Sequence, residues 1–319
     1  MKNKRGEYRL LIGLITLVMV FLFFWFNFLF RDASASVGRM FIVIIGMGLA
    51  LLVVNMVFIG RKSRWYAYDF AGMQDKQTEF RDALIALGRV PVQTQGIFIG
   101  TYCAFTFLFL IQGSSIGLRR ELSVPLFFLL FSTGGLFSTF LYVYADLIGS
   151  KLLYQQKITR YPADLRIKRQ RQKNFLLPAT LVLGSIIFSL SLSHLGLRIT
   201  DLEGRGHLIW NLAFILITAA LFYLIILSQI LVWSRSNGQV FNLIIEQMEQ
   251  LTTNERDLSR RIVINSIDEL ASIAGLVNTF CGTLAGDMSV LKGAQSRLSE
   301  FGTELGQNAA ESAAAVQQI

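Results

Sequence analysis

Long apolar runs alternate with short polar segments along the first 233 residues of the chain. The runs lie at about 10–30, 38–60, 96–112, 123–146, 174–194 and 207–233. Each is about long enough for a helix to cross the hydrocarbon core of a bilayer, which takes about 17–25 residues. The pattern predicts an all-α protein that begins with a six-helix transmembrane bundle.

Composition supports a membrane protein over a soluble one. Hydrophobic residues make up 53% of the 319 residues and charged residues only 16%, with a mean hydropathy of +0.51. A soluble domain carries about 25% charged residues. The net charge of +9 comes mainly from Lys and Arg beside the apolar runs, where they orient helices and meet anionic lipid headgroups. We therefore expect membrane lipid, and not nucleic acid, as a partner.

The distribution of Lys and Arg predicts the orientation in the membrane. With the N-terminus inside, the cytoplasmic segments before residue 174 hold 18 of these residues and the three outer loops hold 6. The positive-inside rule thus places both termini in the cytoplasm. Ala33-Ser34-Ala35 also resembles a signal-peptidase site, so the first span is either cleaved there or an uncleaved anchor. Its apolar stretch is long for a signal peptide, which favours the anchor.

Prolines and basic segments mark the starts of later spans. Pro91, Pro125 and Pro178 fall at or just inside the expected starts of spans three, four and five, where a missing N–H costs least. Amphipathic basic segments at about 76–90 and 151–173 precede the last two hairpins. We expect them to lie outside the bilayer.

The polar tail begins with an amphipathic helix, a connector and a second helix. Apolar residues recur at helical spacing after Trp233: Phe241, Ile244, Ile245, Met248 and Leu251. A polar break at 252–257 follows, and Leu258, Ile262 and Ile264 then indicate an extended connector. A second helix is expected from Ser266, which can cap it, with Glu269 three residues on.

The second helix carries a seven-residue apolar stripe. Its first set of positions is Leu270, Val277, Leu284, Leu291, Leu298 and Leu305, and its second includes Ile273, Phe280, Ala294 and Phe301. A strict repeat over so many heptads predicts a coiled coil or four-helix bundle, and hence self-association. The alternative is a helix that packs on another part of the same chain.

The stretch DLSRRIVINSIDELASIAGLVNTFCGTL (257–284) resembles the HAMP linker module of bacterial membrane receptors. In that family two chains form a parallel four-helix bundle that passes motion from the last membrane helix to an output domain. The resemblance implies three regions: a six-span domain at 1–233, a HAMP-like linker at 234–285 and the start of a signalling coiled coil at 286–319. The matching features imply these signal-relay residues: Leu258, Ile262, Asp268, Glu269 and Phe280.

The last segment, 296–319, is similar to the start of the signalling helix of methyl-accepting chemotaxis proteins. Its AAESAAA stretch resembles their adaptation sites, which makes Glu311 a candidate for methylation; the alternative is an Ala-rich solvated helix face. The family implies a homodimer in the bacterial inner membrane that acts on a cytoplasmic coupling protein and a histidine kinase. No stop signal precedes Ile319, so we expect the native protein to continue into an output domain.

These features favour transmembrane signal transduction of the chemoreceptor type. The alternative is the membrane anchor and HAMP relay of a nucleotide cyclase or histidine kinase whose catalytic domain lies beyond Ile319. The chain itself has no phosphate-binding Gly-rich loop, nucleophile elbow or HExxH pattern, and Cys103 and Cys281 have no metal-ligand spacing. We therefore expect no catalytic, cofactor or metal site in it, and no enzyme activity.

Charged residues are absent from the middle of the expected spans, which argues against an ion-coupled transporter. The strongest polar residues within the spans are Asn27, Asn55, Asn211 and Gln229. Such side chains form hydrogen bonds between membrane helices or, less commonly, contact a ligand.

Overall fold

The computed structural model describes residues 4–30, 37–112, 122–162, 165, 169, 172–203, 208–253 and 261–317. Within these residues the protein is all-α. Six of its helices are long and apolar enough to cross a membrane, so the chain is a multi-pass membrane protein. The elements are α1 (Lys4–Phe30), α2 (Val37–Lys62), η1 (Ser63–Ala67), η2 (Ala71–Met73), α3 (Gln77–Ile111), α4 (Ser123–Gln155), η5 (Gln172–Leu176), α5 (Leu177–Glu203), α6 (Leu208–Thr253) and α7 (Glu269–Gln317).

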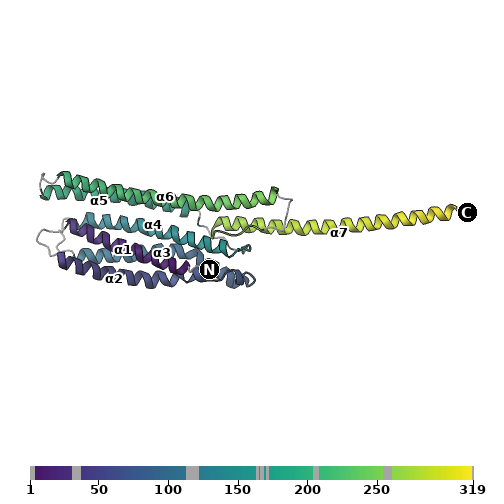
Figure 1. Ribbon diagram of the computed structural model, residues 1–319, viewed down its shortest axis with the longest axis horizontal. Coiled ribbons are helices and arrows are strands. Elements are labelled where there is room, and N and C mark those ends of the chain that lie inside the picture. Colours follow the sequence, from purple (N-terminus) through teal and green to yellow (C-terminus); the bar gives the residue numbers. More distant parts are fainter. Residues whose placement is uncertain are drawn as a thin grey trace.

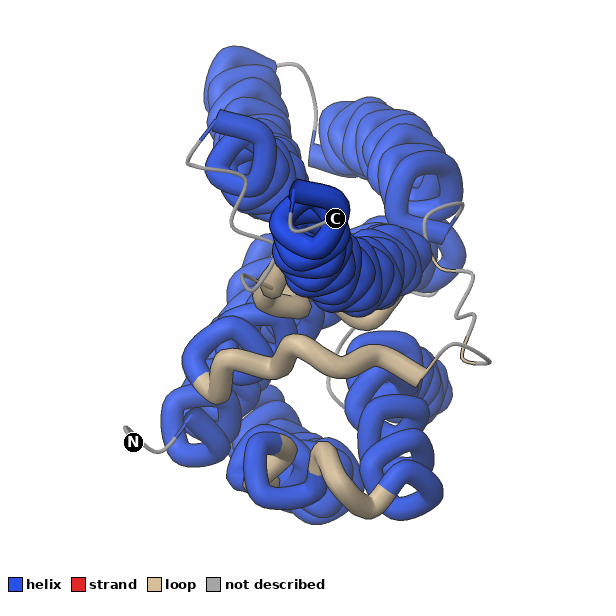
Figure 2. The backbone as a smooth tube through the Cα atoms, turned by 90° about the vertical axis from the view of Figure 1, so that its right-hand side faces the viewer, coloured by secondary structure: helices blue, strands red, loops and turns tan. Residues whose placement is uncertain are grey.

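Helices α1 to α6 run side by side in alternating directions, and α7 extends from one end of this bundle (Figure 1). The N-terminus, the links before α3 and α5, and the start of α7 all lie at that end, which is called the α7 end below. Figure 2 looks along the bundle from there, with the C-terminal part of α7 toward the viewer. Because the N-terminus and α7 lie at the same end of the bundle, the arrangement agrees with an even number of membrane crossings.

Helix α4 lies at the centre of the packing. It contacts α3, α5, α1 and α6, and it is the most deeply buried of the six spans. Small residues on α4 let its neighbours approach closely. At Gly134 the Tyr102 ring of α3 occupies the space that a Cβ would need, so no larger residue fits there without displacing the ring.

Helix α1 belongs to this core. The Phe23 ring packs edge-on against Tyr102 and Phe109 of α3, with centroids 5.4 and 5.2 Å away. Such aromatic pairs add to the stabilisation from burial. The helix therefore forms part of the bundle core, and the possible cleavage site at 33–35 lies outside the described residues.

The beginning of α3 differs from the prediction. The basic segment at 76–90 and the span expected at 96–112 form one helix, and Pro91 lies in its interior instead of at its start. Phe80, Leu84 and Leu87 are buried, so the apolar face of the span continues into the basic segment and keeps it helical. Pro125 and Pro178 lie in the first turns of α4 and α5, as predicted.

Two of the polar residues singled out within the spans join helices. Thr101 donates a hydrogen bond to Asn55 Oδ1 at 2.9 Å, which links α3 to α2. Gln229 Nε2 donates to the Leu136 carbonyl at 3.0 Å, which links α6 to α4. The side chains of Asn27 and Asn211 lie outside the described residues.

Helix α6 continues without a break from the last span into the tail. It runs from Leu208 to Thr253 and so crosses the expected domain boundary at 233–234. The end of α6 and the start of α7 run in the same direction, because the connector returns toward the bundle between them (Figure 1). The last span and the first tail helix therefore form one continuous helix.

Candidate functional site at the start of helix α7

The connector before α7 is extended and packs against the α7 end of the bundle. Ile262 and Ile264 are buried, as the prediction of an extended apolar connector requires. The Ile264 N–H donates a hydrogen bond to the Ile158 carbonyl, 2.7 Å away, in the link after α4. Leu258, another expected relay residue, lies outside the described residues.

Asn278 holds the connector and this link together. Its Oδ1 accepts a hydrogen bond from the Ile262 N–H at 2.7 Å, and its Nδ2 donates to the carbonyls of Ile262 and Thr159, each at 2.8 Å. One amide side chain on α7 thus satisfies three backbone groups of two segments. An amide suits this task because it carries both donors and an acceptor.

Asp268 caps α7. Its Oδ1 accepts a hydrogen bond from the Leu270 N–H at 3.0 Å, which satisfies one of the free N–H groups of the first turn. The prediction that Ser266 caps the helix is wrong, because α7 begins at Glu269 and the Ser266 hydroxyl donates to Asp268 instead. The serine is two residues too early to reach the helix N–H groups.

The other oxygen of Asp268 takes part in a buried ion-pair cluster. Lys173 Nζ lies 2.7 Å from Asp268 Oδ2 and 2.7 Å from Asp146 Oδ2 of α4. Lys173 is 6% exposed and Asp268 only 2%. One ammonium group in η5 therefore bridges a carboxylate of the membrane bundle and the carboxylate that begins the tail helix.

Arg169 completes the cluster from the link before α5. Its Nη1 lies 3.4 Å from Asp146 Oδ1, and its Nη2 donates a hydrogen bond to the Tyr142 hydroxyl at 2.9 Å. Its backbone N–H donates to Glu269 Oε2 at 3.1 Å. We call these five residues the charged junction: Asp146, Arg169, Lys173, Asp268 and Glu269.

The charges of the junction set the protonation state of Asp268. Burial opposes ionisation, but the Lys173 ammonium and the hydrogen bonds from Ser266 and Leu270 outweigh it, so the pKa of Asp268 lies below its usual value. Asp268 is therefore ionised at neutral pH. The neighbouring phenol behaves differently: burial raises the pKa of Tyr161 to about 12.

The first turns of α7 dock on the chain through a narrow face of small residues. Ala271, Ala274 and Cys281 are buried together with Asn278. At Gly275 the backbone of α7 approaches Tyr161 so closely that a Cβ would lie 2.9 Å from the Tyr161 Cβ. The alternative prediction, packing on the same chain, thus holds for these turns.

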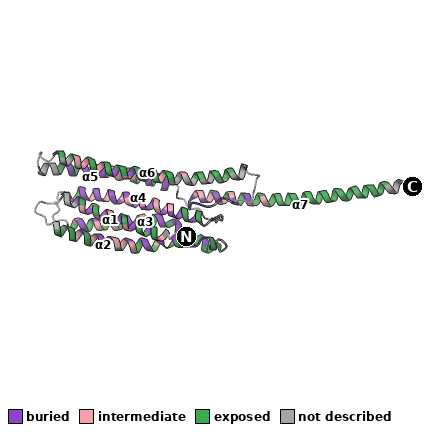
Figure 3. Ribbon diagram, viewed as in Figure 1, coloured by how far each residue is buried: buried purple, intermediate pink, exposed green. Residues whose placement is uncertain are grey.

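Most of the predicted stripe faces away from this contact, although Leu270 and Val277 at its start are half-buried. Phe280 is 66% exposed, and Ile273 and Leu284 are also exposed. Further along α7 the stripe residues Leu291, Leu298 and Leu305 stay exposed, and Figure 3 shows the described residues of this distal part as exposed. Phe280 therefore lies outside the junction in the single chain. Glu311 is exposed as well, and it lies about nine helical turns beyond Phe280.

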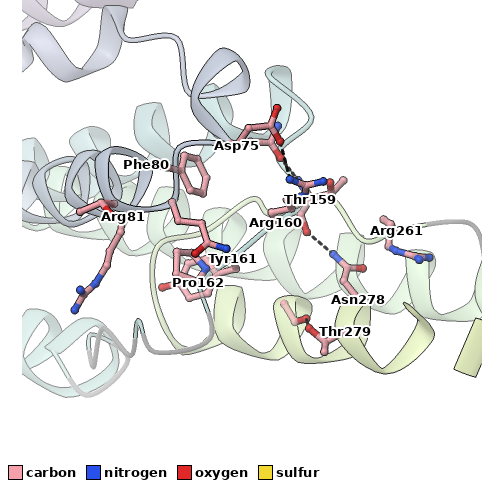
Figure 4. A pocket seen from close by; sticks show the side chains of 14 residues that line it. Asp75, Phe80, Arg81, Thr159, Arg160, Tyr161, Pro162, Arg261, Asn278 and Thr279 are labelled. Carbon is pink, nitrogen blue, oxygen red and sulfur yellow. Dashed lines mark hydrogen bonds and ion pairs between the residues drawn. The ribbon is translucent and has the colours of Figure 1, made fainter. Parts of the chain in front are cut away.

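A polar crevice of about 860 Å³ opens beside Asn278. Figure 4 shows Arg160, Tyr161 and Asn278 around it, and the hydrogen bond from Asn278 to Thr159. The pair of Arg160 and Asp75 at its rim is 2.7 Å apart but mostly exposed, and such pairs contribute little. The crevice separates the first turn of α3 from α7.

Three residues of the junction escaped prediction. The sequence places Arg169 and Lys173 among the positive charges at the lipid headgroups, and Asp146 at the end of span four. The structure buries the two cations and pairs both with Asp146. A hint was available, because Asp146 is a lone acid at the end of an apolar run that a basic segment follows.

Comparisons with protein-family models, curated proteins and solved structures found no match for this chain.

Proposed function

We propose that the protein is a transmembrane signal transducer of the chemoreceptor type, and that the charged junction is the point where the membrane bundle controls the output helix. The observation that carries the proposal is the bridge from Asp146 through Lys173 to Asp268. It couples the central membrane helix to the first residue before α7. In the proposed orientation this end of the bundle and both termini lie in the cytoplasm, at the bacterial inner membrane.

The proposed mechanism has two states of α7. In the docked state the junction and Asn278 hold its first turns against the bundle, as described above. In the released state these turns pack in a HAMP-like bundle with α6 and a second chain. A stimulus acts by stabilising one state over the other, since a signal can shift an equilibrium only by its differential affinity.

The exposed stripe supports the proposal of a homodimer. Leu291, Leu298 and Leu305 project from a helix about 74 Å long, with no cover from the described part of the chain. A second copy of α7 covers such a stripe by coiled-coil packing. Tail positions Phe241, Ile245 and Met248 of α6 are exposed in the same way and supply the other two helices of the proposed bundle.

Glu311 is proposed as an adaptation site. It is exposed on α7, so a modifying enzyme can approach it. Methylation removes a negative charge and lowers repulsion between neighbouring helices, which favours the tightly packed coiled coil. A coupling protein and a histidine kinase are the proposed cytoplasmic partners of the helical output.

The experiment is a disulfide cross-linking series on the chain in membranes, with Cys103 replaced by Ala and Cys281 by Ser. Single cysteines replace Ile273, Phe280, Leu284, Leu291 and Leu298, and control cysteines replace Ser289 and Ser296 on another face of the heptad. We expect disulfides between subunits at the stripe and few at the controls. Absence of this seven-residue pattern contradicts the mechanism.

The rival role, an anchor and relay for a cyclase or kinase domain, shares the junction and the dimer. Glu311 separates the two roles. In a strain with a chemoreceptor methyltransferase, the chemoreceptor proposal expects methyl incorporation that Glu311→Ala abolishes. Incorporation that is absent from the wild type, or unchanged by this substitution, favours the enzyme anchor.

A further inference from the structure

A groove of about 180 Å³ lies within the membrane bundle, between α4, α5 and α6. Its walls include Val143 of α4, Leu181 and Val182 of α5, and Ile226 and Ile230 of α6. These side chains are apolar. The junction lies outside the groove, and no step of the proposed mechanism uses it.

Two buried polar atoms in the groove have no hydrogen-bond partner among the described residues. One is Gln229 Oε1, an acceptor, and the other is Trp233 Nε1, a donor. Gln229 is only 4% exposed. The two residues are four apart on α6, so their side chains lie on the same face of the helix.

The remaining polar groups of the groove are engaged elsewhere. The Tyr223 hydroxyl lies 2.6 Å from the Ser189 hydroxyl. The hydroxyls of Ser185 and Thr139 donate to backbone carbonyls of their own helices, at 2.7 and 2.9 Å. The groove therefore presents an apolar volume with one open acceptor and one open donor. Leaving such atoms unpaired in a dry site is costly, and an occupant with a matching polar group removes that cost.

We propose that this groove binds a small lipophilic alcohol, of the size of a phenol or cyclohexanol. A hydroxyl group can donate to Gln229 Oε1 and accept from Trp233 Nε1. The size follows from the volume, since an apolar cavity of about 150 Å³ accepts a benzene-sized molecule. A lipid acyl chain has no group for the two polar atoms, and a water molecule leaves most of the apolar volume empty.

The site lies where an occupant can act on the output helix. Gln229 ties α6 to α4 through the Leu136 carbonyl, and the same helix continues to Thr253. An occupant that engages Gln229 changes how α6 sits against α4. This consequence rests on the proposed function, whereas binding itself does not.

The test uses the full chain in lipid nanodiscs and fluorine NMR of 4-fluorophenol as the probe. Fluorobenzene, which lacks the hydroxyl group, is the matched control ligand. We expect saturable binding of 4-fluorophenol above its partition into lipid, about tenfold weakened by Gln229→Leu through loss of one hydrogen bond. Fluorobenzene should bind more weakly than 4-fluorophenol and respond little to this substitution.

Two further variants keep the test independent of folding. Val182→Phe fills the groove from its open wall, since Val182 is 57% exposed, and should abolish saturable binding. Ser228→Ala lies outside the groove lining and should leave binding unchanged. Three results each overturn the proposal: no saturable binding, equal binding of both probes, or full binding by the Val182→Phe protein. Because no signalling is measured, failure here leaves the proposed function untouched.

Discussion

Lys173 forms ion pairs with two carboxylates of the junction at once. It lies between two carboxylates that come from segments 122 residues apart, Asp146 and Asp268. A buried ion pair contributes little net stability, yet removing one partner leaves an uncompensated charge in a site of low polarity. Single substitutions in the junction should therefore act strongly on the position of α7.

Replacing Lys173 with Met should release the first turns of α7. The change leaves Asp268 without its counter-charge, while Asp146 keeps only the longer pair with Arg169, at a cost of about 3–5 kcal/mol. Hydrogen exchange should then accelerate at the amides of 261–284. Lys292→Met, on the exposed part of α7, is the control, and equal protection in both variants would contradict the role of Lys173.

Asn278→Asp should loosen the connector although its shape is preserved. The carboxylate still accepts from the Ile262 N–H, but it cannot donate to the carbonyls of Ile262 and Thr159. Each buried carbonyl left unpaired costs about 1–3 kcal/mol. Thiol labelling of a Val263→Cys reporter should become faster, with Thr279→Val as the control. Unchanged labelling would show that the hydrogen bonds donated by Asn278 do not hold the connector in place.

The ion pair of Asp268 makes docking independent of pH over the physiological range. Because the folded pKa is lowered, its contribution is complete above the usual value of about 4 and is lost as pH falls through the folded value. Spin labels at Tyr154 and Leu276, both exposed, should report one distance from pH 8 to pH 5 and a broader distribution at pH 3. In Asp268→Asn the broad distribution should already be present at pH 7.

At the scale of elements, α7 presents two faces with different partners. Its first turns dock through small residues such as Ala271 and Ala274, whose size allows close approach to the bundle. The leucine stripe points outward. The face that the chain itself covers is therefore mainly the small-residue face, and coiled-coil packing of the heptad stripe stays a prediction.

Self-association should depend on this stripe and not on charge in general. Leu291→Glu with Leu298→Glu places two charges in the expected coiled-coil seam and should shift the detergent-solubilised chain from dimer to monomer. Ser289→Glu with Ser296→Glu adds the same charge on another face and should leave the dimer intact. Light scattering after size-exclusion chromatography distinguishes the two species, and equal masses for both variants would count against the stripe.

At the scale of the whole molecule, six antiparallel helices bring the N-terminus and α7 to one end of the bundle. The three links at the opposite end are short.

Orientation in the membrane can be measured directly. In a background without the native cysteines, Ala35→Cys should react with a membrane-impermeant thiol reagent in intact cells, because the link between α1 and α2 lies outside in the proposed topology. Gln74→Cys and Ser299→Cys should react only after permeabilisation, in accord with the positive-inside rule. The reverse labelling pattern would show that the topology is inverted, and the tail could then not contact cytoplasmic partners.

The sequence alone determined the number of spans, the non-helical connector at Ile262 and Ile264, and the two helices of the tail. These features depend on local composition and periodicity, which reflect the length of a bilayer crossing and the spacing of a helix. Only the tertiary structure decided that Arg169 and Lys173 are buried, that Asp268 caps α7, and that an alanine face docks. Those outcomes depend on which distant segments meet, and a carboxylate's partner cannot be identified from spacing when it lies about a hundred residues away.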